Sequence, residues 1–288
     1  MAEKVLVAGA GGRLGRHLLK ELAARGYGVR AVVRDPCTMG EDEDLDVFGC
    51  DARRPESLAG ACDGVSAVVS ALGGSLALRY TPPNATYRDV DLRANLNLLA
   101  EARRAGVRRF VYVSLYGADA LRGHGYVDAH EEFVAALKGS GLEYAVVRPT
   151  GFFYVFAEIF KMAARGRAVL VGDGRARTNP VHEADVARAC ADALDSPGSE
   201  LAVGGPETYT RREIAELAFG ALGRPPKVSS LPPRVVLALT APLKLFDRRL
   251  YDLLEFGVAA STTDLVAPPY GTRSLGEYFG RLAAGGDA

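Results

Sequence analysis

The opening of the chain constrains its fold most strongly. An apolar run from Val5 to Ala8 leads into three glycines spaced by three, Gly9, Gly12 and Gly15, and then into an amphipathic stretch. This order predicts a strand, a tight glycine turn and a helix whose N-terminus holds a diphosphate. A second apolar run, Val29 to Val33, follows at the spacing of a βαβ unit. We therefore predict a dinucleotide site that includes Gly9, Gly12, Arg13, Leu14 and Gly15.

The end of the second strand bears on the choice of cofactor. Arg34 is its first polar residue, at the position where an acid would bind the ribose diol of NAD and an arginine would accept the 2′-phosphate of NADP. Asp35 competes for this role, since it lies about twenty residues past the last glycine. Neighbouring side chains on a strand point to opposite faces, so both cannot face the ribose. Arg13 could close on the same phosphate, because its planar guanidinium suits phosphate oxygens. We favour NADP(H) over NAD(H).

Charge and composition limit the classes of partner. Lys+Arg and Asp+Glu balance at 35 each, so no excess positive field is present to hold a nucleic acid. The four cysteines lack C-x-x-C spacing, which indicates reduced thiols and a cytoplasmic location. No signal peptide is expected, because Glu3 and Lys4 lead directly into the first strand. The most apolar later stretch, Val235 to Phe246, is cut by Pro242 and is too short to span a bilayer, so we expect no membrane partner. A homo-oligomer remains open.

Strand-like and helix-like segments alternate through the first two thirds of the chain. We predict further strands near Val47 and over Ser66–Ala71, Phe110–Val113, Tyr144–Val147 and Leu201–Gly205, and helices over Pro55–Ala61, Tyr87–Arg104, Tyr126–Lys138, Ala184–Ala193 and Arg211–Leu222. Such alternation predicts an α/β fold, a Rossmann-type doubly wound parallel sheet. We expect a dinucleotide-binding domain at 1–154, with 176–205 returning to it. A small, discontinuous C-terminal substrate lobe would comprise 155–175 and 206–288.

Several polar or small residues follow the strands, and parallel strands end at one edge of the sheet. Asp51 could accept a hydrogen bond from the adenine amine, Ala71 and Gly73 would let the backbone pass a ribose, and Pro149 would fix a turn near the nicotinamide. The full set expected to bind the cofactor from these strand ends is Asp51, Ala52, Ala71, Leu72, Gly73, Pro149, Thr150 and Phe152.

The motifs together resemble the atypical short-chain dehydrogenase/reductases, in particular their NAD(P)H-binding, NmrA-like and epimerase-like branch. They are the glycine loop, Asp91–Leu99, Tyr112–Ser114, Tyr126 with His130, Arg148–Phe152 and Asn179–Ala187, and the likeness continues to Thr262–Pro268. The resemblance implies an NAD(P)H cofactor but does not choose a substrate. The family includes reductases, epimerases and dehydratases, and also members that bind NADPH as sensors without turnover.

The resemblance also implies a set of catalytic positions. The family uses an Asn, a Ser, and a Tyr followed four residues later by a Lys. Here Asp91, Ser114, Tyr126 and His130 stand at or near these positions. The spacing of four keeps Tyr126 and His130 on one helix face. A neutral imidazole can hydrogen-bond the nicotinamide ribose as the ammonium does, but it cannot favour a tyrosinate by charge.

Three interpretations follow. Tyr126 acts as general acid toward a carbonyl oxygen that Ser114 polarises, because reduction needs the neutral phenol. Alternatively, His130 or a residue of the C-terminal part is the acid, or Tyr126 and His130 merely begin an exposed helix. We expect an NADPH-dependent reductase or dehydrogenase acting on a small, hydrophobic carbonyl or enone, with a non-catalytic NADPH-binding redox sensor as the alternative.

Two further features complete the expected site. Phe152, Phe153 and Phe156 would give it an apolar lining, although such clusters also form cores. His182 and Asp185 are expected to be structural, at the start of a helix. No metal is expected, because neither has a second His or Cys at ligand spacing on its helix face.

Overall fold

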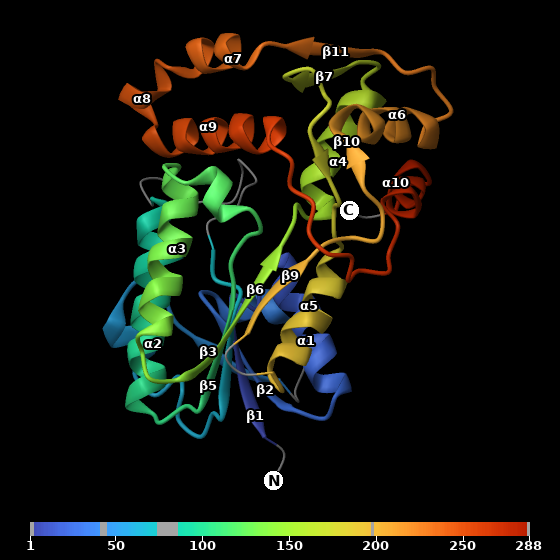
Figure 1. Ribbon diagram of the computed structural model, residues 1–288. Coiled ribbons are helices and arrows are strands. Elements are labelled where there is room, and N and C mark those ends of the chain that lie inside the picture. The colour runs from blue at the N-terminus through green and yellow to red at the C-terminus, as the bar shows by residue number, and fades with distance from the viewer. Residues whose placement is uncertain (1–2, 41–44, 74–85, 197–198, 287–288) are drawn as a thin grey trace.

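A seven-stranded parallel sheet forms the centre of the molecule (Figure 1). The computed structural model describes residues 3–40, 45–73, 86–196 and 199–286. The strands run in the order β3 (Asp46–Gly49), β2 (Gly28–Val33), β1 (Lys4–Ala8), β4 (Ala67–Ser70), β5 (Arg109–Val113), β6 (Glu143–Pro149) and β9 (Ser199–Val203). The predicted Rossmann-type α/β fold is therefore confirmed.

Helices cover both faces of this sheet. On one face lie α1 (Arg13–Ala24) and α5 (Glu183–Ala193), and on the other lie α2 (Ala94–Arg104) and α3 (Gly125–Lys138) (Figure 1). The alternation of side chains along β1 creates this division. Val5 and Val7 pack toward α1 and α5, whereas Leu6 and Ala8 pack toward α2 and α3. Both layers are thus built from one continuous apolar strand.

The strand order reverses next to β1. The chain proceeds from β1 through β2 to β3 on one side, and then returns to place β4 on the other side of β1. In open α/β sheets a ligand binds outside the carboxyl ends of the strands at such a switch point. The glycine loop that follows β1 lies at this point.

Two predicted helices differ from the structure. The helix expected over Pro55–Ala61 is only a 3-10 turn, Pro55–Leu58, because the chain turns at Gly60 with a φ of +82°. The helix expected over Tyr87–Arg104 begins as a π-type turn, Arg88–Arg93, and becomes α-helical only at Ala94. Single π-type turns often occur at functional sites. This one contains Asp91.

The remaining elements build a smaller lobe. They are α4 (Phe153–Ala164), β7 (Ala168–Val171), β8 (Arg177–Thr178), β10 (Tyr209–Thr210), α6 (Arg211–Ala221), β11 (Val228–Leu231), α7 (Pro233–Thr240), α8 (Leu243–Phe246), α9 (Arg248–Thr262) and α10 (Leu275–Ala283). The lobe core joins α4 and β7 to α6 and α10. It therefore draws on two stretches separated in sequence by α5 and β9, as a discontinuous lobe requires.

In Figure 1, α7, α8 and α9 form an arch at the end of this lobe, with α9 nearest α3. Within the described residues, none of the helices combines the length and apolar character needed to cross a membrane.

Candidate functional site

The glycine loop has the close packing that a dinucleotide cradle needs. Gly9 has a φ of +80°, and a Cβ there would lie 2.8 Å from the carbonyl oxygen of Ala71 at the end of β4. A Cβ at Gly15 would lie 2.2 Å from the carbonyl oxygen of Gly9, and one at Gly12 would lie 3.2 Å from it. Any side chain at Gly9 or Gly15 would therefore clash with neighbouring backbone atoms.

The N-terminus of α1 is open to an anion. Gly12 caps it without a side chain, and the first turn, with Arg13 and Leu14, has no acidic residue. The amide groups of such a turn point outward and attract phosphate oxygens. The loop and this helix end together fit the diphosphate of a dinucleotide.

The two candidates after β2 differ in what they do. The carboxylate of Asp35 accepts a hydrogen bond from the amide of Cys37 at 3.0 Å and caps a 3-10 turn, Pro36–Met39. Arg34 is exposed at the end of the strand. Arg16 of α1 holds the same loop by donating to the carbonyl of Thr38. Asp35 thus serves the loop, and this leaves Arg34 as the better candidate for the ribose.

Arg13 lies elsewhere in the crevice. Its guanidinium carbon is 5.3 Å from the centre of the Tyr154 ring, which in turn stacks on Phe152 at 5.7 Å. Phe152 follows β6 and bridges to Val181. The structure therefore brings the glycine loop to the end of β6 and the lobe.

The loops after β3 and β4 are held by side chains of α2 and the π-type turn. Asp51 forms a bidentate ion pair with Arg53, whose hydrogen bonds hold the pKa of the carboxyl below its usual range. Asn97 donates to the carbonyl of buried Ala52 at 3.0 Å. A Cβ at Gly73 would lie 3.1 Å from Asp91 Oδ1. Asp51 would have to share its carboxylate between Arg53 and an adenine amine.

After β6, Pro149 and Thr150 are buried. Thr150 donates to the carbonyl of Asn179 at 2.6 Å, and Asn179 in turn donates to the carbonyl of Ala267. These bonds join the end of β6 to the C-terminal segment and fix the wall of the crevice.

His130 is enclosed between two partners on the inner side of α3. Its Nδ1 lies 2.6 Å from the phenol oxygen of Tyr112, and its Nε2 lies 3.2 Å from Asp91 Oδ1, without the alignment of a hydrogen bond. Burial raises the pKa of Tyr112 well above its usual range, so the phenol keeps its proton. In the tautomer that carries its proton on Nε2, His130 accepts the hydrogen bond of this phenol at Nδ1. The Nε2 proton then faces the fully buried Asp91 carboxylate. The imidazole thus belongs to a buried Tyr112–His130–Asp91 chain, and a ribose could reach only its Nε2.

Tyr126 lies one turn earlier on the same helix. Its ring meets those of His130, Tyr87 and Phe256 at centroid distances of 4.7, 5.1 and 4.8 Å. Burial is the main reason that the pKa of the phenol lies well above its usual range, and nearby Asp91 adds to the effect. Tyr126 therefore keeps its proton near neutral pH, so it could act as a proton donor but not as a base. The interpretation of these two residues as an exposed helix start is wrong, because His130 is only 4 % exposed.

Ser114 is engaged by an ion pair. Its hydroxyl donates to Glu131 Oε1 at 3.2 Å and accepts from Arg148 Nη1 at 3.3 Å, while Arg148 and Glu131 are 2.6 Å apart. To polarise a substrate carbonyl, this hydroxyl would have to turn away from Glu131. The role expected for Ser114 stays a prediction.

The sequence analysis missed a second group of polar residues near Arg13. Burial raises the pKa of Tyr154 to about 12 and also raises that of Glu183, which is 5 % exposed in the first turn of α5. Burial likewise raises the pKa of Tyr278 to about 12. In the sequence, Tyr154 looks like one more member of an aromatic cluster, and Glu183 looks like an ordinary acidic residue at a helix start. Nothing local in the sequence could have revealed their burial.

His182 and Asp185 have the structural roles predicted for them. His182 Nδ1 accepts a hydrogen bond from the amide of Ala184 and caps α5. Burial, with smaller contributions from Arg273 and His17, lowers the pKa of this imidazole to about 4. Asp185 is fully buried and accepts from Arg273 at 2.5 Å. In the described part of the chain, no three His, Cys, Asp or Glu side chains are grouped to hold a metal.

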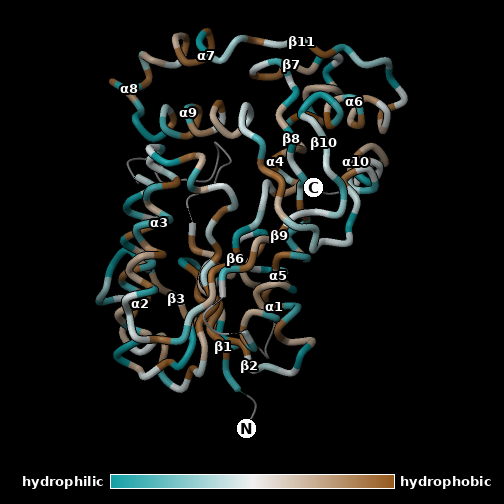
Figure 2. The backbone as a smooth tube through the Cα atoms, in the orientation of Figure 1, coloured by the Kyte–Doolittle hydropathy of each residue, from teal (hydrophilic) through white to brown (hydrophobic). Residues whose placement is uncertain are grey.

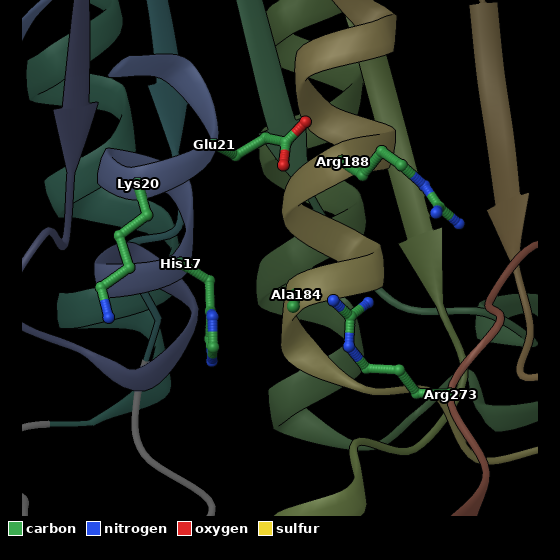
Figure 3. A pocket seen from close by; sticks show the side chains of 6 residues that line it. All are labelled: His17, Lys20, Glu21, Ala184, Arg188 and Arg273. Carbon is green, nitrogen blue, oxygen red and sulfur yellow. The ribbon is translucent and has the colours of Figure 1, made fainter. Parts of the chain in front are cut away.

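A pocket of about 290 Å³ lies between α1 and α5, beside the crevice wall (Figure 3). Its lining comes from α1 on one side and from α5 and the C-terminal segment on the other: His17, Lys20, Glu21, Ala184, Arg188 and Arg273. Asp185 pairs with both arginines. This carboxylate offsets part of the positive charge of the two arginines. The pocket therefore does not present a strongly positive surface to a ligand.

Known proteins share this architecture. The NAD(P)H-binding family matches residues 9–197. Divinyl chlorophyllide a 8-vinyl-reductase, chloroplastic, from Zea mays is 30 % identical, over 99 % of this chain and 80 % of that protein. Photosystem II assembly factor Ycf39 from Trieres chinensis is 23 % identical, over 79 % of this chain and 72 % of that protein. The NADPH-dependent quinone oxidoreductase QOR2 of Escherichia coli, solved with NADPH, has the same fold at a TM-score of 0.79 and 22 % identity, over 96 % and 99 % of the two chains.

One relative bears on localisation. The maize protein is named as chloroplastic, and the cytoplasmic location expected from the cysteines stays a prediction. The glycine cradle, the switch-point crevice and the family match agree with one another. The chain belongs to the NAD(P)H-binding branch of the atypical short-chain dehydrogenase/reductases.

Proposed function

We propose that the chain is an NADPH-dependent reductase in which Tyr126 is the proton donor. The observation that carries this proposal is the phenol of Tyr126, whose pKa lies well above its usual range and whose ring packs against His130 on α3. NADPH, when bound, supplies a hydride to a substrate carbon. Tyr126 gives its proton to the oxygen, or to the second carbon of a conjugated double bond, and then recovers a proton from solvent. Both transfers together complete a two-electron reduction.

The preference for NADPH rests on Arg34. Its guanidinium is free to meet a 2′-phosphate from the end of β2, while Asp35 is used as a cap. Arg34→Asp should weaken NADPH binding by at least about tenfold and leave NADH binding within about twofold. Equal weakening of both cofactors, measured by calorimetry, would remove the preference.

The substrate proposed is a small, hydrophobic carbonyl or enone. Aromatic rings surround Tyr126, and Phe152 stacks on Tyr154 just after β6. Such a lining favours a flat, conjugated molecule. The names of two similar proteins, a vinyl-reductase and a quinone oxidoreductase, agree with this class.

Transfer of a label tests the reaction. Protein with NADPH deuterated at C4 is offered a panel of carbonyls, enones and quinones, and deuterium in the product is measured by mass spectrometry. Tyr126→Phe should reduce transfer by about a hundredfold or more, while Tyr209→Phe, a matched change in the lobe, should not. If Tyr126→Phe transfers deuterium as fast as the parent chain, Tyr126 is not the donor.

A regulatory protein that binds NADPH without turnover is the second candidate. The enclosure of His130 by Tyr112 and Asp91 favours it, because the imidazole is held by the protein and not presented to a substrate. A relative named as an assembly factor agrees with such a role. Tight NADPH binding with no deuterium transfer to any compound, also after His130→Lys, would support this candidate over the reductase.

A further inference from the structure

The arch at the end of the lobe is the least buried part of the described chain. No residue from 231 to 248 is buried, although many of them are apolar. Leu239 is 72 % exposed, and Leu245 and Phe246 are 85 % and 84 % exposed. Outside this segment, the only large apolar side chains of comparable class in the described residues are Leu96 and Val169, each 37 % exposed. Several strongly exposed apolar side chains within one segment indicate an interaction site.

The most exposed residues lie at the edge of the molecule. Leu245 and Phe246 are consecutive on α8, and α7 and α8 lie on the side of α9 away from α3 (Figure 1). Apolar residues follow both helices along this edge (Figure 2). The high exposed fractions of Leu239, Leu245 and Phe246 show that these side chains face solvent.

A slightly longer stretch, residues 224–249, which adds β11 and the start of α9 to this segment, is rich in basic residues although the whole chain has zero net charge. Between residues 224 and 249 there is one acidic side chain, Asp247, against six basic ones: Arg224, Lys227, Arg234, Lys244, Arg248 and Arg249. Lys227, Arg234 and Lys244 are exposed. The charge of Arg248 is offset by Asp252 of α9, whose Oδ1 lies 2.9 Å from Arg248 Nε. Exposed leucine and phenylalanine side chains in a segment rich in lysine and arginine are typical of a segment that lies on a membrane.

We infer that the arch, residues 224–249, docks on an anionic lipid surface. Leu239, Leu245 and Phe246 would enter the interfacial region, and the exposed side chains of Lys227, Arg234 and Lys244 would meet lipid phosphates. The charge argues against a second copy of this chain as the occupant, because the same basic face would then meet itself. Neither α7 nor α8 is long enough to span the bilayer, so the contact that we propose is peripheral. It revises the expectation from sequence that the chain has no membrane partner.

Vesicle binding tests the inference. The full chain is sedimented with vesicles of phosphatidylcholine alone, and with vesicles that contain about one third phosphatidylglycerol. Binding should be much stronger to the anionic vesicles and should fall with added salt. Binding to neither kind, or equal binding to both, overturns the inference.

Two variants separate the apolar and the charged contributions. Leu239→Ser/Leu245→Ser/Phe246→Ser should lower vesicle partitioning by about a hundredfold or more, whereas Leu96→Ser on α2 should not change it. Lys227→Glu/Arg234→Glu should lower it by about thirtyfold, and Arg103→Glu/Arg175→Glu by less than about threefold. Circular dichroism checks that each variant is folded. If light scattering instead shows a dimer that the triple serine variant abolishes, the occupant is a second copy and the inference is wrong.

Discussion

The two ends of the crevice are built on different principles. At the glycine loop, the shape of the backbone is the functional feature, and most of it is determined by the closely spaced Gly9, Gly12 and Gly15, with the end of β4 packed against Gly9. At Tyr126 and His130, function depends on side chains that the fold brings from elsewhere, since Tyr112 lies 18 residues before His130 and Asp91 lies on the π-type turn before α2. A loop of the first kind can be interpreted from its sequence alone. A site of the second kind needs its partners before its chemistry can be stated.

The first prediction concerns the loop, where the expected effect is largest. Gly15→Ala should lower the free energy of unfolding by about 3 kcal/mol or more, because the new methyl group would lie 2.2 Å from the carbonyl oxygen of Gly9. Both groups are backbone-anchored, so neither can move aside cheaply. Urea denaturation followed by circular dichroism measures the loss.

Gly220→Ala provides the matched control. Gly220 is exposed within α6, and a Cβ there would meet no atom within 4 Å. This change should raise stability by about 0.5–1 kcal/mol, since alanine favours the helix. Equal effects of the two substitutions would contradict the view that steric fit makes the loop.

The second prediction concerns the other end of the crevice. Tyr112→Phe should lower the free energy of unfolding by about 2 kcal/mol, because His130 Nδ1 would be left buried without its hydrogen bond. Tyr126→Phe should change it by less than about 0.5 kcal/mol, since its phenol bonds no other described residue. A similar loss of stability in both variants, measured by urea denaturation, would show that the Tyr112–His130 hydrogen bond stabilises the fold no more than the hydroxyl of Tyr126 does.

The third prediction concerns His182, at the junction of the two domains. Its pKa is lowered to about 4, so between pH 6.5 and pH 4 the unfolded chain binds a proton that the folded chain does not. This contribution to stability is complete above pH 6.5 and is lost as the pH falls toward 4. We expect a loss of about 1.5 kcal/mol by pH 4.5, allowing for solvent screening of a half-buried ring.

His182→Asn isolates the pH-dependent contribution of His182 to stability, because asparagine is also a good N-cap but does not titrate. The variant should match the parent chain near pH 7.5 and exceed it in relative stability at pH 4.5, in denaturation curves collected at both values. Parallel pH profiles for the two proteins would mean that His182 titrates normally.

Strand positions and the cofactor loop could be predicted because they depend on local patterns. The alternation of Val5 and Val7 with Leu6 and Ala8 already implies a strand covered on both faces. The three glycines imply the cradle. The boundaries were less accurate where a single residue ends an element, as Gly60 does after Pro55–Leu58.

The chemistry at Tyr126 could be predicted only in part. The spacing of Tyr126 and His130 correctly placed them on one face of α3. It did not reveal that His130 faces Tyr112 and Asp91, because such contacts depend on how β5 packs against α3 and the π-type turn. Similarly, Ser114 reads as a free hydroxyl until Glu131 and Arg148 are seen beside it.

The last prediction concerns the smallest effect and the neighbours Arg34 and Asp35. Asp35→Ala should lower stability by about 0.5 kcal/mol, because only the cap on the amide of Cys37 is lost. The ratio of NADPH to NADH affinity should stay within about twofold of the parent value, since this carboxylate faces the loop. Calorimetric titration with both cofactors measures the ratio. A shift toward NADPH of about tenfold would show that Asp35 reaches the ribose, and the division of roles between these two residues would then have to be reversed.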